Sequence, residues 1–225
     1  IFIDSYDDTW NMNISQIEDK ITVKTKAIMA VHIFGLSVDM DPLINLANQY
    51  NLLIIEDAAE AIGLNYKGKP CGSFGDISTF SFYPNKLITS GEGGMIVTDD
   101  ETLAERCRSL RNLCFKPEKR FVHDELGWNF RMTNIQAAVG LAQLEQLRES
   151  VIKKRWIGNR YQENLKEVDE LIQLPLKKTE YTENVYWVFA MVLNEKTSLN
   201  GADEMMVELS QYGIGSRPFF FPLHN

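Results

Sequence analysis

The stretch Leu52-Leu53-Ile54-Ile55-Glu56-Asp57 decides the fold class, because an unbroken apolar run ends there in two carboxylates. A short continuous Leu/Ile run is typical of a parallel strand that is buried on both faces. Open α/β sheets bind their ligands at the carboxyl ends of such strands. The pair Glu56 and Asp57 therefore marks either a ligand site or an ordinary strand-ending turn, and this segment alone leaves both interpretations open.

Strands and helices alternate on either side of this run. The expected elements are strands at 1–4, 26–32, 77–82 and 95–98 and helices at 41–50 and 101–113. Asp41 and Asp100 are suited to cap the two helices, and Pro42 fits the first helical position. This alternation predicts an α/β protein with a mostly parallel sheet.

The second half of the chain opens with a helix signal. Thr133 and Gln136 have the spacing of a capping box, and the helical pattern that follows continues to about Leu165. A helix of that length is longer than one sheet layer needs, so we expect it to connect two lobes. The sequence thus predicts a large domain (1–132), a connecting helix (133–165) and part of a smaller α/β domain (166–225). The expected elements of that smaller domain are strands at 186–193 and 216–221 and a helix at 202–212.

The composition excludes several classes of protein. The 225 residues carry 23 Lys and Arg against 31 Asp and Glu, and the net charge of −8 disfavours a nucleic-acid partner. No apolar run reaches the roughly 20 residues that span a bilayer, so no membrane partner is expected. Cys71, Cys107 and Cys114 show no metal-ligand or disulfide spacing, which indicates a cytoplasmic protein. Because the chain starts at Ile1 and not at Met, we expect it to be part of a longer protein.

A lysine and a glycine-rich segment follow the two carboxylates along the chain. Lys86 stands just past the expected strand 77–82, at the end of Ser81-Phe82-Tyr83-Pro84-Asn85-Lys86. Such a lysine is either a nucleophile at the ligand edge or a solvated loop residue. The segment Thr89-Ser90-Gly91-Glu92-Gly93-Gly94 lacks the Lys-Ser/Thr ending of a Walker loop and does not match Gly-x-Gly-x-x-Gly. Neither nucleotide-binding fingerprint therefore applies.

Four motifs, taken in order, resemble one known family. They are EDAAEAIG (56–63), GSFGDISTFSFYPNK (72–86), TSGEGGMIVTDD (89–100) and GWNFRMTNIQAAVGLAQLEQL (127–147). The chain resembles the DegT/DnrJ/StrS-type sugar aminotransferases, which use pyridoxal 5'-phosphate (PLP) and have the aspartate aminotransferase fold (fold type I). Within the family, EDAAEAIG and RPFFFPLH (217–224) are most similar to enzymes that aminate a GDP-linked 4-keto-6-deoxy sugar.

The resemblance implies roles for five residues. Lys86 matches the lysine that holds PLP covalently and then moves a proton, and Asp57 matches the carboxylate that keeps the pyridine nitrogen protonated. Ser81 matches a ligand of the PLP phosphate. Asn129 matches an asparagine that reaches this phosphate from the neighbouring subunit, which implies a homodimer with shared sites. Glu60 lies where the family often has Gln near the phenolic oxygen; an ionised Glu60 would repel a phenolate, so we expect it to be protonated or turned away.

Further residues are candidates for contact with the substrate. His123 lies where such enzymes approach the sugar, although a solvated loop histidine is equally expected. Arg131 and Arg217 are candidates to pair with the nucleotide diphosphate, with structural roles as the alternative. His32, at the end of strand 26–32, is interpreted as a satisfied structural histidine and not as a contact of the cofactor ring.

The function that the resemblance implies is amino transfer to a nucleotide-linked keto sugar, with glutamate as the expected amino-acid donor. The dehydratase branch of the family carries His at the lysine position, so Lys86 favours transamination. A non-catalytic relative would need neither Lys86 nor Asp57, and the presence of both argues against it.

Overall fold

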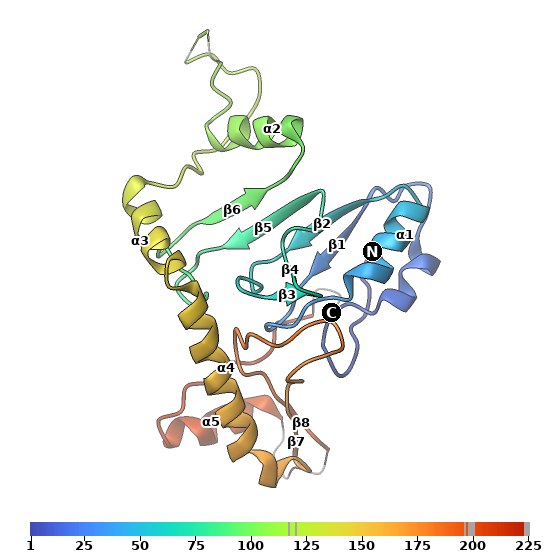
Figure 1. The fold of residues 1–225 in the computed structure, drawn as a ribbon, viewed down its shortest axis with the longest axis vertical. Helices are drawn as coiled ribbons and strands as arrows, with labels where there is room; N and C mark the ends of the chain where they lie inside the picture. The colour runs from blue at the N-terminus through green and yellow to red at the C-terminus, as the bar shows by residue number, and fades with distance from the viewer. Residues whose placement is uncertain (117, 120, 196, 198–200, 223–225) are drawn as a thin grey trace.

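A four-stranded sheet forms the centre of the fold. The computed structural model describes residues 1–116, 118–119, 121–195, 197 and 201–222. The sheet has the order β1-β2-β5-β6, in which β1, β2 and β5 run parallel and β6 runs antiparallel to β5 (Figure 1). Its strands are β1 (Ala27–Val31), β2 (Leu53–Asp57), β5 (Ile77–Ser81) and β6 (Gly94–Val97). The prediction of an α/β protein with a mostly parallel sheet is confirmed.

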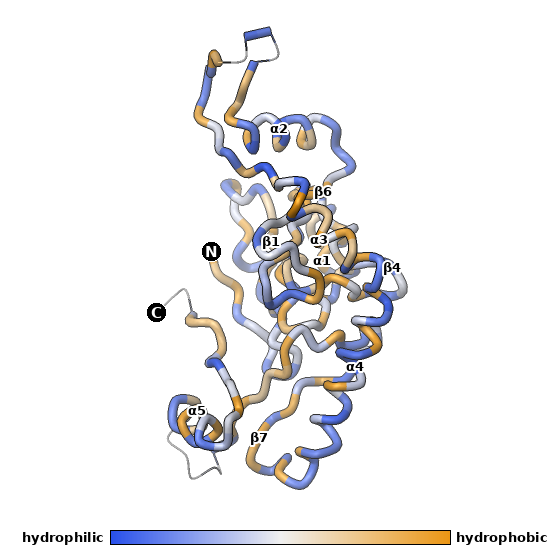
Figure 2. Tube along the Cα trace, turned by 90° about the vertical axis from the view of Figure 1, so that its left-hand side faces the viewer, coloured by the Kyte–Doolittle hydropathy of each residue, from blue (hydrophilic) through white to orange (hydrophobic). Residues whose placement is uncertain are grey.

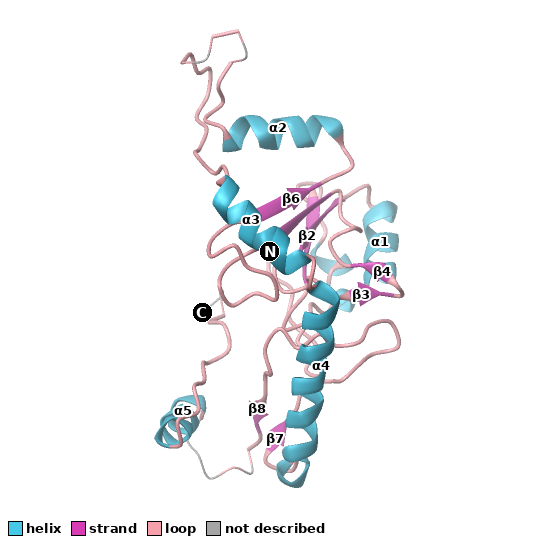
Figure 3. Ribbon diagram, turned by 60° about the vertical axis from the view of Figure 1, so that its left-hand side comes forward, coloured by secondary structure: helices cyan, strands magenta, loops and turns pink. Residues whose placement is uncertain are grey.

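Helices and two small ribbons surround this sheet. The helices are α1 (Met40–Gln49), α2 (Glu101–Arg111), α3 (Asn134–Leu144), α4 (Leu147–Asn164) and α5 (Ala202–Gln211), with three short 3-10 turns at Ile14–Gln16, Glu18–Lys20 and Lys166–Val168. The ribbons pair β3 (Asn65–Tyr66) with β4 (Lys69–Pro70) and β7 (Ile172–Gln173) with β8 (Val192–Leu193). Figure 3 shows α4 running away from the sheet toward β7 and β8, and Figure 2 shows α5 standing apart from α4. Among the described residues, no helix is long and apolar enough to cross a membrane.

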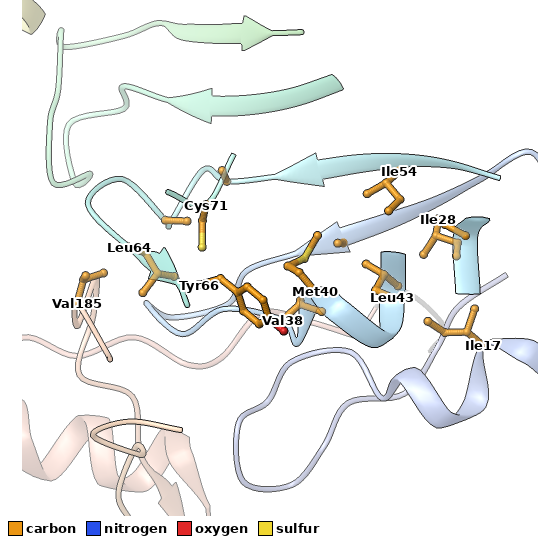
Figure 4. Packing of buried hydrophobic residues seen from close by; sticks show 14 residues of the cluster. Ile17, Ile28, Val38, Met40, Leu43, Ile54, Leu64, Tyr66, Cys71 and Val185 are labelled. Carbon is orange, nitrogen blue, oxygen red and sulfur yellow. The ribbon is translucent and has the colours of Figure 1, made fainter. Parts of the chain in front are cut away.

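One face of the sheet carries the core. Ile28 and Ile54 point from β1 and β2 toward α1, where they meet Met40 and Leu43, and Tyr66 closes the same cluster (Figure 4). Met29 and Leu53, on the opposite face of these strands, are 56% and 55% exposed. The expectation that the Leu52–Ile55 strand is buried on both faces is therefore wrong for this chain, because the described residues pack against one face of it.

The register of the sheet collects the candidate site residues at one edge. Asp57 is the last residue of β2 and pairs with Val31 and Thr79. Ser81 is the last residue of β5, and Lys86 follows in the next turn. The carboxyl ends of the parallel strands thus bring the carboxylate, the hydroxyl and the amine to the same side of the sheet.

Two of the three predicted helix caps are confirmed. The side chain of Asp100 accepts a hydrogen bond from the Leu103 N–H at the start of α2, and Thr133 forms the complete capping box at the start of α3. The prediction for α1 is wrong, since the helix begins at Met40 and its N-cap is Asp39. The hydroxyl of Tyr66 donates to the Asp39 carboxylate and accepts from the Asp41 N–H, so Tyr66 caps this helix end from outside.

The expected single helix over 133–165 is two helices. α3 ends at Leu144 and α4 begins at Leu147, and the two contact different neighbours. Gln143 of α3 accepts the Thr89 N–H, whereas Leu147 and Val151 of α4 lie against Gly63. The division into domains at residues 132 and 166 stays a prediction.

Three expected strands are absent or much shorter. Of 186–193 only Val192–Leu193 is a strand: Tyr186 has a φ of +50°, outside the extended region, and the chain bends at 187–188. Residues 1–4 form no strand, although Ser5 pairs with Met12 through one bridge. Residues 216–221 also form no strand, and the Phe219 ring packs instead on Trp10 and Phe34.

Two glycines on neighbouring helices allow a matched test of the packing around α4. An added Cβ at Gly158 would lie 2.3 Å from the Tyr186 ring, whereas at Gly140 on α3 the nearest atom is 3.7 Å away. We expect Gly158→Ala to destabilise the protein by about 1–3 kcal/mol through overpacking. Gly140→Ala should instead stabilise it by about 0.5–1 kcal/mol through helix propensity. Urea unfolding measures both, and a Gly158→Ala protein as stable as the parent would contradict the packing described.

Candidate functional site

The centre of the candidate site is the side chain of Lys86. Its amine lies 3.8 Å from Oε1 of Glu60 and 3.9 Å from the centre of the Trp187 ring, and 11% of the side chain is exposed. Burial lowers the pKa of the Lys86 amine, while the negative charges of Glu60 and Asp57 oppose this shift. A small cavity adjoins the amine and is lined by residues that include Ala59, Leu87 and Val185. The structure thus places a largely buried amine with a lowered pKa beside two carboxyl groups.

Glu60 faces this amine and does not turn away from it. Its Oε2 accepts a hydrogen bond of 2.8 Å from the Phe34 N–H. Burial raises the pKa of Glu60 to about 7, against the opposing effects of the Phe34 N–H and of the Lys86 charge. Of the two expectations for Glu60, the structure supports a carboxyl group that holds its proton up to neutral pH.

Asp57 and Ser81 complete the edge of the sheet. Oδ1 of Asp57 accepts the Ala59 N–H at 3.0 Å, which holds the carboxylate at the start of the turn after β2. Oγ of Ser81 accepts the Tyr83 N–H at 3.3 Å, and the half-buried residue pairs with Gly94. The glycine-rich turn 91–93 lies beside it, where the backbone of Phe82 bonds to those of Ser90 and Gly93.

Glu56, the neighbour of Asp57, points in the opposite direction and is fully buried. Nε2–H of His32 donates to its Oε1 at 2.8 Å, and Nδ1 of His32 accepts the Val38 N–H at 3.0 Å. This pair of bonds requires the neutral His32 tautomer with its hydrogen on Nε2. The interpretation of His32 as a satisfied structural histidine is confirmed.

The loop before β5 and the second residue of β5 supply the remaining donors to Glu56. They are the N–H groups of Gly72, Phe74 and Gly75 and the hydroxyl of Ser78. Burial alone would raise the pKa of Glu56, but the hydrogen bonds from His32, Gly72 and Phe74 outweigh it and lower the pKa to about 2. His32, Glu56 and Cys71 lie close enough together to suggest a metal site. However, hydrogen bonds from the protein already occupy both His32 nitrogens and both Glu56 oxygens.

The structure does not join the other predicted site residues to this centre. Nδ1–H of His123 donates to the Leu113 carbonyl at 2.6 Å, and Nε of Arg131 donates to Oδ1 of Asn129 at 3.2 Å. Asn129 also pairs with Asn112 through one bridge. His123, Asn129, Arg131 and Arg217 are all exposed. Within the described part of the chain, no hydrogen bond or ion pair links any of them to Lys86, Asp57 or Ser81.

Local sequence patterns did not indicate Trp187, which lies next to Lys86, or Phe34, which contacts Trp187 and Glu60. Trp187 is 8% exposed, and its Nε1–H donates to the Asn85 carbonyl at 3.1 Å. Phe34, which is 9% exposed, stacks on Trp187 with ring centres 6.4 Å apart. The segment 186–193 reads as an ordinary strand, and no local pattern indicates that Trp187 reaches a lysine 101 positions earlier. The positive φ of Phe34 before Gly35 is also invisible without the fold.

The comparisons with known proteins agree with the fold. All of the chain, residues 1–225, matches the DegT/DnrJ/EryC1/StrS aminotransferase family. GDP-perosamine synthase from Escherichia coli O157:H7 is 45% identical over 224 residues, which cover 100% of this chain and 60% of that protein. GDP-perosamine synthase from Caulobacter vibrioides is 42% identical with the same coverage. The chain thus spans about three fifths of the length of these relatives.

Solved structures give the same result. A DegT/DnrJ/EryC1/StrS aminotransferase from Brucella abortus superposes with a TM-score of 0.85 at 30% identity, covering 100% of this chain and 60% of that one. The PLP form of Spr1654 from Streptococcus pneumoniae superposes with a TM-score of 0.84 at 27% identity, covering 96% and 59%. The fold is therefore that of the PLP-dependent sugar aminotransferases. The chain belongs to the DegT/DnrJ/EryC1/StrS aminotransferase family, as the sequence motifs predict.

The contributions of the two buried glutamates, Glu56 and Glu60, to the stability of the fold should change with pH in opposite directions. The pKa of Glu56 is lowered to about 2 from the ordinary 4.5, so its ionised form stabilises the fold above pH 4.5 by about 3 kcal/mol, and this is lost as the pH falls to 2. Glu56→Gln should be less stable than the parent at pH 7 by a similar amount, and this deficit should shrink toward pH 3. Urea unfolding at both pH values measures it.

Glu60→Gln is the matched control for this test. The pKa of Glu60 is raised to about 7, so its contribution is fully present below pH 4.5 and is lost as the pH rises to 7. The parent should lose stability relative to Glu60→Gln between pH 5 and pH 7. If the stability difference between parent and variant changed with pH in the same direction for Glu56→Gln and for Glu60→Gln, the pKa assignments would be wrong.

Proposed function

We propose that this chain carries the cofactor-binding core of a PLP-dependent aminotransferase that acts on a nucleotide-linked 4-keto-6-deoxy sugar, with glutamate as the amino donor. The observation that carries the proposal is the largely buried Lys86 amine beside Asp57 and Glu60 at the carboxyl edge of the sheet. The similarity to GDP-perosamine synthases supports a GDP-linked sugar. The three cysteines are free, which supports a location in the cytoplasm.

The residues at the edge of the sheet fit PLP by the chemistry of their donor groups. The cofactor offers an aldehyde, a ring nitrogen and a phosphate, and the edge offers an amine (Lys86), a carboxylate (Asp57) and a hydroxyl (Ser81). When bound, PLP supplies an electron sink for the carbon that exchanges its amino group. The lowered pKa increases the fraction of Lys86 amine that is unprotonated at a given pH, and the unprotonated amine is the form that binds an aldehyde covalently.

Each side chain has a separate part in the reaction. The Lys86 amine binds the cofactor and, once released, removes and returns the proton on the reacting carbon. The Asp57 carboxylate holds a proton on the ring nitrogen, and Ser81 donates a hydrogen bond to the phosphate. Glu60, with its pKa near 7, can donate a hydrogen bond to an oxygen anion, which an ionised carboxylate cannot do.

The exposed cations offer contacts for the substrate. Arg131 and Arg217 suit the two phosphates of a nucleotide diphosphate, because guanidinium groups bind phosphate oxygens in pairs. His123 offers a ring nitrogen to the sugar. Their exposure leaves all three accessible to a bound substrate.

A homodimer would bring Asn129 to a second site. Trp128, Phe130 and Ile135 flank Asn129 and the start of α3, and they are 44%, 72% and 80% exposed. Such an apolar surface favours contact with a second copy of the chain. In this arrangement the Asn129 amide reaches the phosphate held at the partner's sheet edge.

Covalent labelling tests the role of Lys86. The protein is incubated with PLP, reduced with borohydride and mapped by peptide mass spectrometry. We expect the pyridoxyl group on Lys86, and Lys86→Arg should remove it. Lys154→Arg is the matched control, since burial also lowers the pKa of Lys154. Label that stays on Lys154 and is absent from Lys86 would overturn the proposal.

Mixing of two inactive variants tests the shared site. Lys86→Ala and Asn129→Ala proteins should each lose most of the transaminase activity with GDP-linked 4-keto-6-deoxymannose and glutamate. After subunit exchange, one site per heterodimer has both intact groups, so about a quarter of the parental activity should return at equal mixing. No recovery in verified heterodimers would mean that each chain builds its site alone.

A further inference from the structure

Trp187 contacts both Lys86 and the residue before it, Asn85. The indole ring lies 3.9 Å from the Lys86 amine, and the indole Nε1–H donates to the Asn85 carbonyl at 3.1 Å. One side chain therefore holds both the charged end of the lysine and the backbone immediately before it. A residue that only filled the core would need neither contact.

The position of Trp187 is fixed from several sides. Its carbonyl accepts a 2.9 Å hydrogen bond from the Lys154 amine on α4, and the Val185 N–H donates to the Gly35 carbonyl at 3.0 Å. A Cβ at Gly35 would lie 2.9 Å from the Trp187 nitrogen, so the two backbones meet where a side chain would not fit. Packing of the Gly35 backbone against that of residues 185–187 thus places the Trp187 ring beside Lys86.

Phe34 connects the two partners of the Lys86 amine. Its ring stacks on Trp187 with an interplanar angle of 7°, and its N–H donates to Glu60 at 2.8 Å. The amine therefore lies between the Trp187 ring and the Glu60 carboxyl group, and Phe34 contacts both of them. The charged or titratable groups that face it are Glu60 and Asp57.

We propose that Trp187 is a positioning residue for Lys86, whose indole ring holds the free amine toward Asp57 and Glu60 and whose Nε1–H fixes the Asn85-Lys86 backbone. The inference rests on the role proposed for Lys86. A lysine side chain has four rotatable bonds, and an aromatic face that attracts the ammonium group restricts them. The amine is then already in place when an aldehyde arrives, and it returns to the same place after release.

Two substitutions separate the contributions of the ring and of the N–H group. Trp187→Phe keeps an aromatic face and removes the hydrogen bond to Asn85. Trp187→Leu removes both. Trp156→Phe and Trp156→Leu on α4 are the matched controls, because Trp156 is 66% exposed. Circular dichroism tests whether each variant is folded.

The first measurement needs no cofactor. Competitive acetylation with trace acetic anhydride gives the rate of acetylation of the Lys86 amine as a function of pH, and the midpoint of this curve reports the pKa of the amine. The aromatic face stabilises the ammonium form, so its loss in Trp187→Leu should lower the midpoint by about one pH unit. Trp187→Phe and the Trp156 variants should keep the parental midpoint. An unchanged midpoint in a folded Trp187→Leu protein would overturn the inference.

The second measurement is the initial rate of pyridoxyl labelling at Lys86, with PLP and borohydride. Loss of the Nε1–H bond should lower this rate about three- to tenfold in Trp187→Phe, because the Asn85-Lys86 backbone is no longer fixed. If Trp187→Leu does not fold, an unchanged rate in Trp187→Phe overturns the inference. Absence of label on Lys86 in the parent would instead contradict the proposed function, so the two failures are distinguishable.

Discussion

The buried carboxylate of Glu56 is the constraint on which the rest of the site depends. It accepts hydrogen bonds from His32 at the end of β1 and from four donors between Gly72 and Ser78. A buried charge is costly unless every oxygen is paired, so these groups cannot separate independently. The ends of β1 and β2 and the start of β5 are thereby held together, and the candidate site residues follow directly from these strands.

Three carboxyl groups within five positions have different environments for physical reasons. Successive side chains of a strand point to opposite faces, so Glu56 enters the core while its neighbour Asp57 points to the other face of the sheet. Asp57 is also the last residue of β2, so it lies at the carboxyl edge. Glu56 meets five donors and its pKa falls to about 2, whereas Glu60 meets one backbone N–H and its pKa rises to about 7. The number of donors, and not burial alone, decides which of the two glutamates is charged at neutral pH.

Parts of the chain that are far apart in the sequence enclose the lysine. Trp10, Phe34, Trp187 and Phe220 form one aromatic group, and Trp187 contacts Lys86 directly. Residues of the C-terminal segment thus complete a site whose reactive groups stand on the sheet.

The sequence by itself determined the strand–helix order, the mostly parallel sheet, the caps at Asp100 and Thr133, and the family, because these depend on local patterns of a few residues. It also indicated Asp57 and Lys86, since chemistry at strand ends is visible in short motifs. Only the tertiary structure decided that Glu56 is buried, that Glu60 faces Lys86, and that the Trp187 ring lies over the Lys86 amine. It also decided that the helix over 133–165 breaks and that only two residues of the expected strand 186–193 are extended and paired. These features arise from contacts between residues far apart in the sequence, and local propensity carries no information about such contacts.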